Sequence, residues 1–435
     1  MTNALASPGP SPGPALHVRT EQRAGLRVVL LEGDASEISP LADLRAVCCV
    51  RTGAMSLLER LRHRERWRGD ISVVGVVCAP ERAAIVAETT GLAVNAFDSF
   101  GDDVVGVLAH AVTVPEEALA LKPNHALVDR ESGQILALRT HGRALEGWPS
   151  EHHRVELSGR VISQAIALLT RPWSVRTHRD MAMTHDFAML TGEGPGTIPR
   201  MSQFPGIAMI ADCSAGRCPY MHPSAKVGIG SILDCEAGSI VIDEGAVVRP
   251  GAILIGPCYV GKHSTVLERA TIRPQTAIGP WCKVNGEVGG TIFQGYSNKS
   301  HDGYLGDSWV GEWVNLGAGT TSSNLLNTYG EIMARATPGG KHEQTGLQFL
   351  GAIVGDHIKT AICTRIMTGS VLHTGSMFAT TAAVQGCVEG FIWATDEGSK
   401  PYRINKFLEV GKVAMKRRGK ELTPVQEAVL RELSE

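Results

Sequence analysis

The chain has 435 residues, too many for one ordinary hydrophobic core, so we expect two domains with additional segments. Its net charge of −2 argues against a nucleic-acid-binding surface, and no apolar run approaches the roughly 20 residues of a membrane span. Aromatic residues make up 5% of the chain while 49 residues are glycine, a balance that favours a stacked repeat with tight corners over a large α/β core.

The chain begins MTNALASPGPSPGP, which has neither a basic start nor an apolar stretch. We therefore expect residues 1–25 to be a disordered leader rather than a secretion signal. The ten cysteines are scattered, a usage typical of reduced thiols in a cytoplasmic protein. Cys213 and Cys218 could form half of a metal site or simply pack, because no second pair matches them.

Residues 26–156 have the pattern of an α/β domain. The expected strands are 26–31, 72–78 and 104–111, and the expected helices are 53–67 and 80–88. Asp129–Gly133 has the composition of a hairpin turn. Strands that alternate with helices predict a partly parallel sheet, with ligands at the carboxyl ends of its strands. Residues 157–220 are expected to form a helical connector, with Pro172 as a break.

Residues 221–395 contain a repeat of period six, which is neither the 3.6 of a helix nor the alternation of a strand. The large aliphatic positions are Ile242, Val248, Leu254, Val260, Val266, Ile272, Ile278 and Val284. The small positions are Ala246, Ala252, Cys258, Ser264, Ala270, Thr276 and Cys282. One aliphatic side chain for each face and one small corner residue predict a triangular β-solenoid.

The repeat is expected to break at 285–303 and to resume twice. The later positions are Tyr304, Val310 and Leu316, then, after a loop at 321–349, Val354, Ile366, Leu372 and Phe378, with Thr360 in a missing apolar slot. Residues 396–435 predict a basic helix, a turn at Thr423–Pro424 and a second helix.

Polar residues concentrate where the repeat breaks, in the string HDGYLGDSWVGEWVNLGAGTTSSN at 301–324. This string resembles the acetyltransferase half of the bifunctional N-acetylglucosamine-1-phosphate uridyltransferase / glucosamine-1-phosphate N-acetyltransferase family. Toward the front, the order of Pro40-Leu41, Arg45, Arg51, Gly53 and Glu59-Arg60-Leu61 is similar to a sugar-nucleotidyltransferase-like subgroup. The resemblance implies an α/β nucleotidyltransferase-like domain followed by a left-handed parallel β-helix.

Carried over residue by residue, the resemblance implies that His301 is the base that takes a proton from the sugar amine. It places Ala318 as a backbone N–H donor to the thioester oxygen. It also implies acetyl-CoA contacts from Asn315, Gly317 and Gly319, and sugar-phosphate contacts from Arg273, Tyr304 and Asn324. Lys299, which lies two residues before His301, is a further candidate for a phosphate contact, in place of lysines that the family has and this chain lacks. Each of these side chains could instead be an ordinary loop, ladder or exposed coil residue.

The chain also departs from the family pattern. Gly289, Leu325 and Gly330 stand where the family has Lys, Tyr and Lys, which leaves the acceptor open between an amino-sugar phosphate and a nucleotide sugar. The Gly-rich loop of pyrophosphorylases is absent from EGDASEISP at 32–40. Arg45 and Arg51 either offer charge to a nucleotide triphosphate or are solvated helix-end residues, so the domain is expected to be degenerate.

The leading hypothesis is an acetyl-CoA-dependent N-acetyltransferase of UDP-N-acetylglucosamine-type biosynthesis, either alone or with uridylyl transfer that uses Mg²⁺. We expect a cytoplasmic homotrimer that binds neither nucleic acid nor membranes. One alternative is a γ-type carbonic anhydrase, for which His263, His301, His357 and His373 are candidate zinc ligands without the expected spacing. The other is a nucleotide-sugar-binding or scaffold protein that has lost one or both activities.

Overall fold

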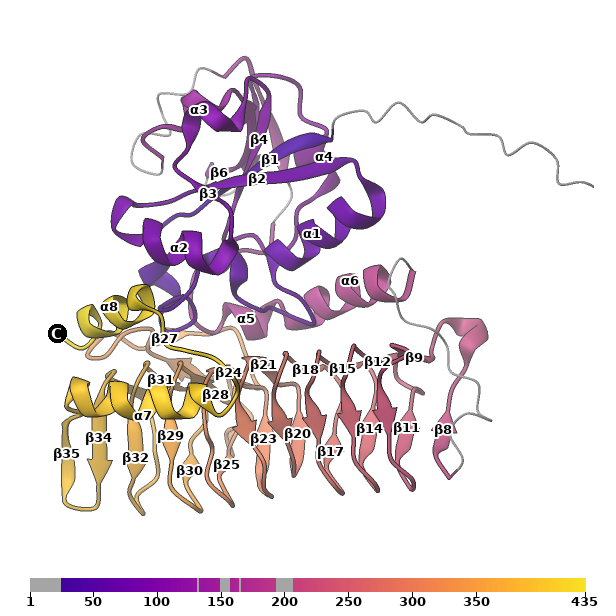
Figure 1. Cartoon of the computed structure of the whole chain (residues 1–435), viewed down its shortest axis with the longest axis vertical. Helices are drawn as coiled ribbons and strands as arrows, with labels where there is room; N and C mark the ends of the chain where they lie inside the picture. Colours follow the sequence, from indigo (N-terminus) through magenta and orange to yellow (C-terminus); the bar gives the residue numbers. More distant parts are fainter. Residues whose placement is uncertain (1–24, 131–132, 149–156, 164–165, 193–205) are drawn as a thin grey trace, which may run out of the picture.

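The structure is a computed structural model that describes residues 25–130, 133–148, 157–163, 166–192 and 206–435. The expected leader lies outside the described residues except for Gly25. A mixed α/β lobe stands on one side of a long coil of short parallel strands, and the C-terminal helices return along the coil (Figure 1). None of the described helices combines the length and the apolarity that a membrane crossing requires.

The lobe is built on a seven-stranded sheet of order β3-β2-β1-β4-β6-β5-β7, in which β6 alone runs antiparallel to its neighbours. The strands are β1 (Leu26–Leu31), β2 (Ile71–Val77), β3 (Ala93–Val94), β4 (Val104–Leu108), β5 (His125–Asp129), β6 (Ile135–Thr140) and β7 (Gly159–Ser163). The predicted hairpin is therefore confirmed as β5–β6. Because β7 pairs with β5, the sheet extends past residue 156 into the segment that we expected to be helical.

Six helices accompany this sheet and its connection to the coil. They are α1 (Leu57–Arg68), α2 (Ala83–Thr90), α3 (Phe97–Phe100), α4 (Glu116–Leu119), α5 (Ser174–Thr177) and α6 (Arg179–Gly192). The limits of α1 follow from local chemistry, since Ser56 and Glu59 form a capping box at its start and Gly69 adopts the left-handed conformation at its end.

The coil has three faces built from short, mostly parallel strands; face 1 is one nine-stranded sheet, whereas faces 2 and 3 each consist of two sheets. Face 1 contains β9 (Pro219–Met221), β12 (Ile240–Ile242), β15 (Cys258–Val260), β18 (Thr276–Ile278), β21 (Ile292–Gly295), β24 (Trp309–Glu312), β28 (Ala352–Val354), β31 (Ser370–Leu372) and β33 (Cys387–Val388). Face 2 contains β10 (Lys226–Val227), β13 (Val247–Val248), β16 (Thr265–Val266), β19 (Lys283–Val284), β22 (Asn298–Lys299), β29 (Lys359–Thr360), β32 (Met377–Ala379), β34 (Ile392–Thr395) and the antiparallel β35 (Gly398–Pro401). Face 3 contains β8 (Ala208–Ile210), β11 (Ile232–Asp234), β14 (Ile253–Ile255), β17 (Thr271–Ile272), β20 (Glu287–Gly289), β23 (Tyr304–Gly306), β25 (Thr321–Ser322) and β30 (Arg365–Ile366).

The period-six repeat is confirmed, because every large and small position predicted between 242 and 284 is at most 1% exposed. The predicted break is wrong: β20, β21 and β22 continue the coil with shorter turns. Val284 pairs with Lys299 after 15 residues, whereas Val266 pairs with Val284 after 18. Leu305 rather than Tyr304 then points inward. The coil also begins at β8, earlier than expected, because β8 pairs with β11.

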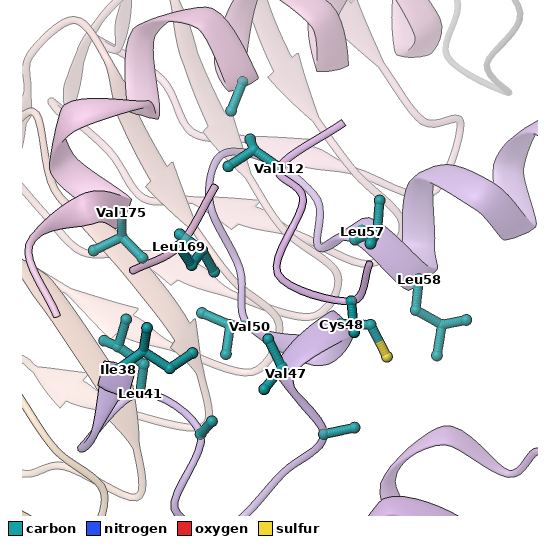
Figure 2. Packing of buried hydrophobic residues seen from close by; sticks show 14 of the residues in the cluster. Ile38, Leu41, Val47, Cys48, Val50, Leu57, Leu58, Val112, Leu169 and Val175 are labelled. Atoms are coloured by element: carbon teal, nitrogen blue, oxygen red, sulfur yellow. The ribbon is translucent and has the colours of Figure 1, made fainter. Parts of the chain in front are cut away.

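The lobe covers face 1 of the coil. Outward side chains of face 1 share one buried cluster with the base of the lobe; they are Val241, Tyr259, Ala277, Ile292, Trp309, Ile353 and Val371. Figure 2 shows part of the lobe's contribution, with Ile38, Leu41 and Val50 close to Leu169 and Val175. Trp309 is fully buried and its indole N–H donates to the carbonyl of Arg51 at 3.1 Å. Apolar burial of this kind fixes the lobe on the coil.

A column of aromatic rings marks the corner between faces 1 and 2. It consists of His263, Trp281, Tyr296, Trp313 and His357, all with φ between 57° and 60° except Tyr296 at 52°. Phe407 continues the column at 5.6 Å from His357 and belongs to α7 (Ile404–Lys416). The predicted terminal helices are therefore confirmed as α7 and α8 (Pro424–Glu432), and the column docks α7 along face 2 (Figure 1).

Candidate functional site

A groove of about 620 Å³ lies between face 2 and the C-terminal end of α7. Four of the residues predicted from sequence line it, namely His301, Asn315, Gly317 and Ala318. The remaining lining residues are Lys283, Tyr296, Asn298, Ser300, Trp313, Val314, Leu316, Lys359, Ile362, Ala414, Arg417 and Arg418. The coil thus brings the core of the predicted site together in one place.

His301 occupies the corner between faces 2 and 3, since it follows β22 and precedes β23. Its side chain is exposed, and its backbone carbonyl accepts a hydrogen bond from the ammonium of Lys299 at 2.8 Å. The imidazole can therefore reach reactants on either face. This corner position is suited to a group that moves a proton between two bound molecules.

The backbone from Gly317 to Gly319 presents one unused donor. The N–H of Gly317 donates to Thr360 Oγ1 at 2.9 Å, and that of Gly319 donates to the carbonyl of Asp302 at 3.2 Å. No acceptor in the described part of the chain takes the N–H of Ala318. Gly317 is required for packing, because a Cβ there would collide with the carbonyl of Ala361 on the next turn. Ala318 thus offers the groove a backbone donor that no acceptor of the described chain occupies.

Among the described residues, four lysine and arginine side chains line the groove and no carboxylate does so. They are Lys283, Lys359, Arg417 and Arg418, none of which we assigned from sequence. Burial lowers the pKa of Lys359 to about 8, and its ammonium donates to the carbonyl of His357 at 3.0 Å. Arg418 holds the end of α7 in place by donating to Asn298 Oδ1 at 2.7 Å. The basic run KRRGK at 416–420 was the sequence feature that could have indicated these arginines as ligand contacts. Their position in the groove, however, depends on how α7 docks on the coil.

Tyr304 and Asn324 lie together on the face 3 side of His301. The amide of Asn324 donates to the Tyr304 hydroxyl at 3.0 Å and to Asp307 Oδ2 at 2.7 Å. Asp307 in turn pairs with Arg176 and Arg179, each at 2.8 Å. Burial raises the pKa of Tyr304, so its hydroxyl remains protonated and can donate to a ligand.

Two predicted phosphate ligands have other partners. Arg273 is 54% exposed on face 3 and forms an ion pair with Glu287. Lys299 is 2% exposed, because it fills an inward position of the coil, where its ammonium donates to the carbonyls of Asn285 and His301. The prediction that Lys299 contacts a phosphate is therefore wrong. Its role in the structure is to hold the carbonyl of His301.

The nucleotide-binding roles of Arg45 and Arg51 do not fit the structure either. Both arginines are buried at the junction of lobe and coil, at 3% and 4% exposure. Arg45 pairs with Asp356 of the coil at 2.8 Å, and Arg51 pairs with Glu59 at 2.7 Å. The sequence did not indicate that these arginines are buried, because a partner such as Asp356 is distant along the chain.

The lobe has a separate cavity of about 690 Å³ at the carboxyl ends of β1 and β4. The order of the sheet reverses between these two strands, which is the usual ligand position in open α/β sheets. Asp34 and His110 line the cavity, whereas Arg45 and Arg51 do not. Burial lowers the pKa of His110, and the hydrogen bonds from Ser36 lower that of Asp34.

The candidate metal ligands do not converge. Among the histidines considered for zinc, His263 and His357 belong to the aromatic column and His373 contacts Ser39 and Cys387. Cys213 and Cys218 are joined as a disulfide, so they do not form the half of a metal site considered from sequence, and the other eight cysteines are free thiols. Within the described ranges, no three His, Cys, Asp or Glu side chains are grouped to hold a metal ion.

Fold and groove together define a β-helix protein with a cationic groove beside α7. No protein-family model matches the chain. It is 27% identical over 177 residues to the bifunctional protein GlmU of Methanococcus aeolicus, which covers 40% of this chain and 41% of the relative. It is 34% identical over 134 residues to the bifunctional sugar-1-phosphate nucleotidylyltransferase/acetyltransferase of Sulfurisphaera tokodaii. This match covers 30% of this chain and 33% of the relative.

The chain is thus a distant and partial homologue of this bifunctional nucleotidyltransferase/acetyltransferase family, and it matches less than half the length of these relatives. Among solved structures, LpxA from Acinetobacter baumannii covers 49% of this chain and 78% of its own at 12% identity, with a TM-score of 0.25. That score is too low for a structural argument.

Proposed function

We propose that the chain is an acetyl-CoA-dependent N-acetyltransferase whose acceptor is an amino sugar that carries phosphate. The observation that carries the proposal is the groove in which His301, Asn315 and the unused N–H of Ala318 lie together. The partial homology to bifunctional nucleotidyltransferase/acetyltransferases supports it.

The groove fits acetyl-CoA in size and in charge. Its volume of about 620 Å³ is in the range of small-molecule sites. Lysine and arginine side chains attract a ligand with several phosphates, and Tyr296 and Trp313, whose faces stack on each other in the aromatic column, add apolar ring edges. Acetyl-CoA, when bound, supplies a thioester whose acyl carbon an amine can attack.

The residues of the chain then have distinct tasks. Tyr304 and Asn324 orient the acceptor on face 3, and His301 at the corner takes the proton that the amine loses as its nitrogen bonds to the acyl carbon. The N–H of Ala318 donates to the oxygen on which negative charge develops. The proton passes from His301 to solvent or to the leaving thiolate, which balances the reaction.

The lobe provides a second candidate activity, nucleotidyl transfer to a sugar 1-phosphate with Mg²⁺. The cavity of about 690 Å³ at the reversal point of the sheet favours it. The carboxylates lining that cavity, Asp34 and Glu37, would be the metal-facing groups. A homotrimer located in the cytoplasm is part of the same proposal, and a non-catalytic scaffold is the competing outcome.

A free-thiol assay with acetyl-CoA and a panel of amino sugars, amino-sugar phosphates and nucleotide-linked amino sugars tests the proposal. We expect CoA release that requires an amine and that falls at least 100-fold in His301→Ala. His222→Ala is the matched control, because His222 is a coil histidine outside the groove and should leave the rate unchanged. Binding of acetyl-CoA without turnover of any amine would instead support the scaffold.

A further inference from the structure

We propose that a second hollow in the coil binds the nucleotide part of the acceptor, so that the acceptor is a nucleotide-linked amino sugar. The hollow has a volume of about 660 Å³ and lies between the coil and the hairpin of β26 (Met333–Ala334) and β27 (Glu343–Gln344). This inference rests on the proposed function for the sugar end of the ligand and on the hollow itself for the nucleotide end.

Among the described residues, the arginines beside the acceptor cluster on face 3 already have carboxylate partners. Arg273 is paired with Glu287, and both Arg176 and Arg179 are paired with Asp307. A sugar 1-phosphate bound beside Tyr304 would have to break one of these ion pairs. An acceptor whose phosphates extend to an unpaired cation avoids that cost.

Arg335 is such a cation. It lines the hollow, and its Nε is buried without a hydrogen-bond partner among the described residues. His342 lies beside Arg335 in the hairpin. Ala334 pairs with Glu343 in antiparallel fashion, Arg335 follows Ala334, and His342 precedes Glu343. No Asp or Glu lines the hollow. A planar guanidinium with free donors next to an imidazole is suited to a diphosphate.

The hollow and the acceptor cluster contain neighbouring residues of the chain. Ser323 lines it, and the next residue, Asn324, is the one whose amide donates to the hydroxyl of Tyr304. Thr368, on the following turn, lines the same hollow and donates to Ser323 Oγ at 2.8 Å. A ligand can therefore place its sugar at Tyr304 and its diphosphate at Arg335 along one side of the coil.

The rest of the lining fits a nucleoside. Met333 and Met367 are 47% and 40% exposed, and with Leu325 they provide apolar surface for a flat base. Side-chain amides, which can pair with the edge of a base, come from Asn327 and Gln385. A hexose phosphate alone would leave this surface uncovered.

Titration calorimetry with UDP, ADP and GDP tests the hollow on wild type, Arg335→Gln and the control Arg249→Gln, an exposed coil arginine paired with Glu268. We expect at least one nucleoside diphosphate to bind, with an affinity that falls tenfold or more in Arg335→Gln and is unchanged in the control. Hydrogen exchange should show protection of residues 323–327 on binding. His342→Gln should give a smaller loss, which guards against misfolding of the first variant.

Binding that Arg335→Gln does not weaken would overturn the inference and assign the nucleotide to the lobe cavity; absence of binding would also overturn it. In the acetyltransfer assay, Arg335→Gln should raise the KM of a nucleotide-linked amino sugar tenfold and leave kcat and the KM of an amino-sugar 1-phosphate unchanged. CoA release by the wild type without any nucleotide binding that depends on Arg335 refutes this inference alone. Retained binding without any CoA release refutes the proposed transferase and leaves the nucleotide site in place.

Discussion

Replacement of Lys299 by methionine should stabilise the coil and damage the site. The ammonium of Lys299 is 2% exposed in the coil interior, and burial lowers its pKa from 10.5 to about 8. At pH 7 the side chain is charged in both the folded and the unfolded states. The lower pKa corresponds to about 3 kcal/mol by which folding disfavours the charged side chain, and methionine, of similar length, does not carry this cost.

The sign of the pH dependence follows from proton binding. Between pH 8 and 10.5 the unfolded chain holds a proton on Lys299 that the folded chain has released, so this residue's contribution makes stability rise with pH. The advantage of Lys299→Met over wild type should therefore shrink by about 2 kcal/mol from pH 7 to pH 10. Paired denaturant unfolding of the two proteins at each pH measures this difference and cancels the titration of cysteines and tyrosines.

The functional cost of the same substitution has a separate cause. Methionine cannot donate to the carbonyls of Asn285 and His301. The corner that carries the imidazole therefore loses the two hydrogen bonds that hold its backbone in position. We expect kcat to fall about tenfold while the KM of acetyl-CoA changes little. A stability difference that stays constant with pH would refute the account of the buried ammonium, and an unchanged kcat would refute its role in holding His301.

Three further substitutions test other parts of the structure. Trp309→Ala should cost about 3–5 kcal/mol in denaturant unfolding because the indole is fully buried between lobe and coil; a loss below about 1 kcal/mol would contradict that packing. Arg45→Met should cost up to about 3 kcal/mol by leaving Asp356 unpaired. Burial raises the pKa of this carboxyl to about 6 with Arg45 in place, and loss of the arginine raises it further, so the cost should be small below pH 6 and should grow as the pH rises above 6; a loss independent of pH would contradict the ion pair. Joint replacement of Arg417 and Arg418 by alanine should raise the KM of acetyl-CoA about tenfold, and less in high salt; steady-state kinetics that show no change would remove both arginines from the site.

The coil could be predicted from sequence because its interior requires a large aliphatic residue and a small residue at the same two positions of each face. Positions such as Val248 and Ala252 repeat at fixed intervals, and the structure buries both completely or nearly so. The same rule failed where turns become shorter. Lys299 occupies an inward slot, and a lysine in a sequence is expected to be exposed unless its partners, here backbone carbonyls, are known.

The candidate site was predicted only where a local string defines it. His301, Asn315 and Ala318 are close in sequence and share the groove. Arg417 and Arg418 are about 100 residues further along the chain, and they reach the groove because Phe407 docks α7 on the aromatic column. Such tertiary relations, like the pairing of Arg45 with Asp356, leave no periodic signal in a single sequence.

A crystal structure of the full chain with acetyl-CoA tests the central claim most directly. We expect the coenzyme in the groove under α7, with the thioester oxygen about 3 Å from the N–H of Ala318 and the phosphates beside Lys283, Arg417 or Arg418. The imidazole of His301 should face the acyl carbon from the corner. Coenzyme bound in the lobe cavity, or with its thioester away from Ala318, would contradict the account.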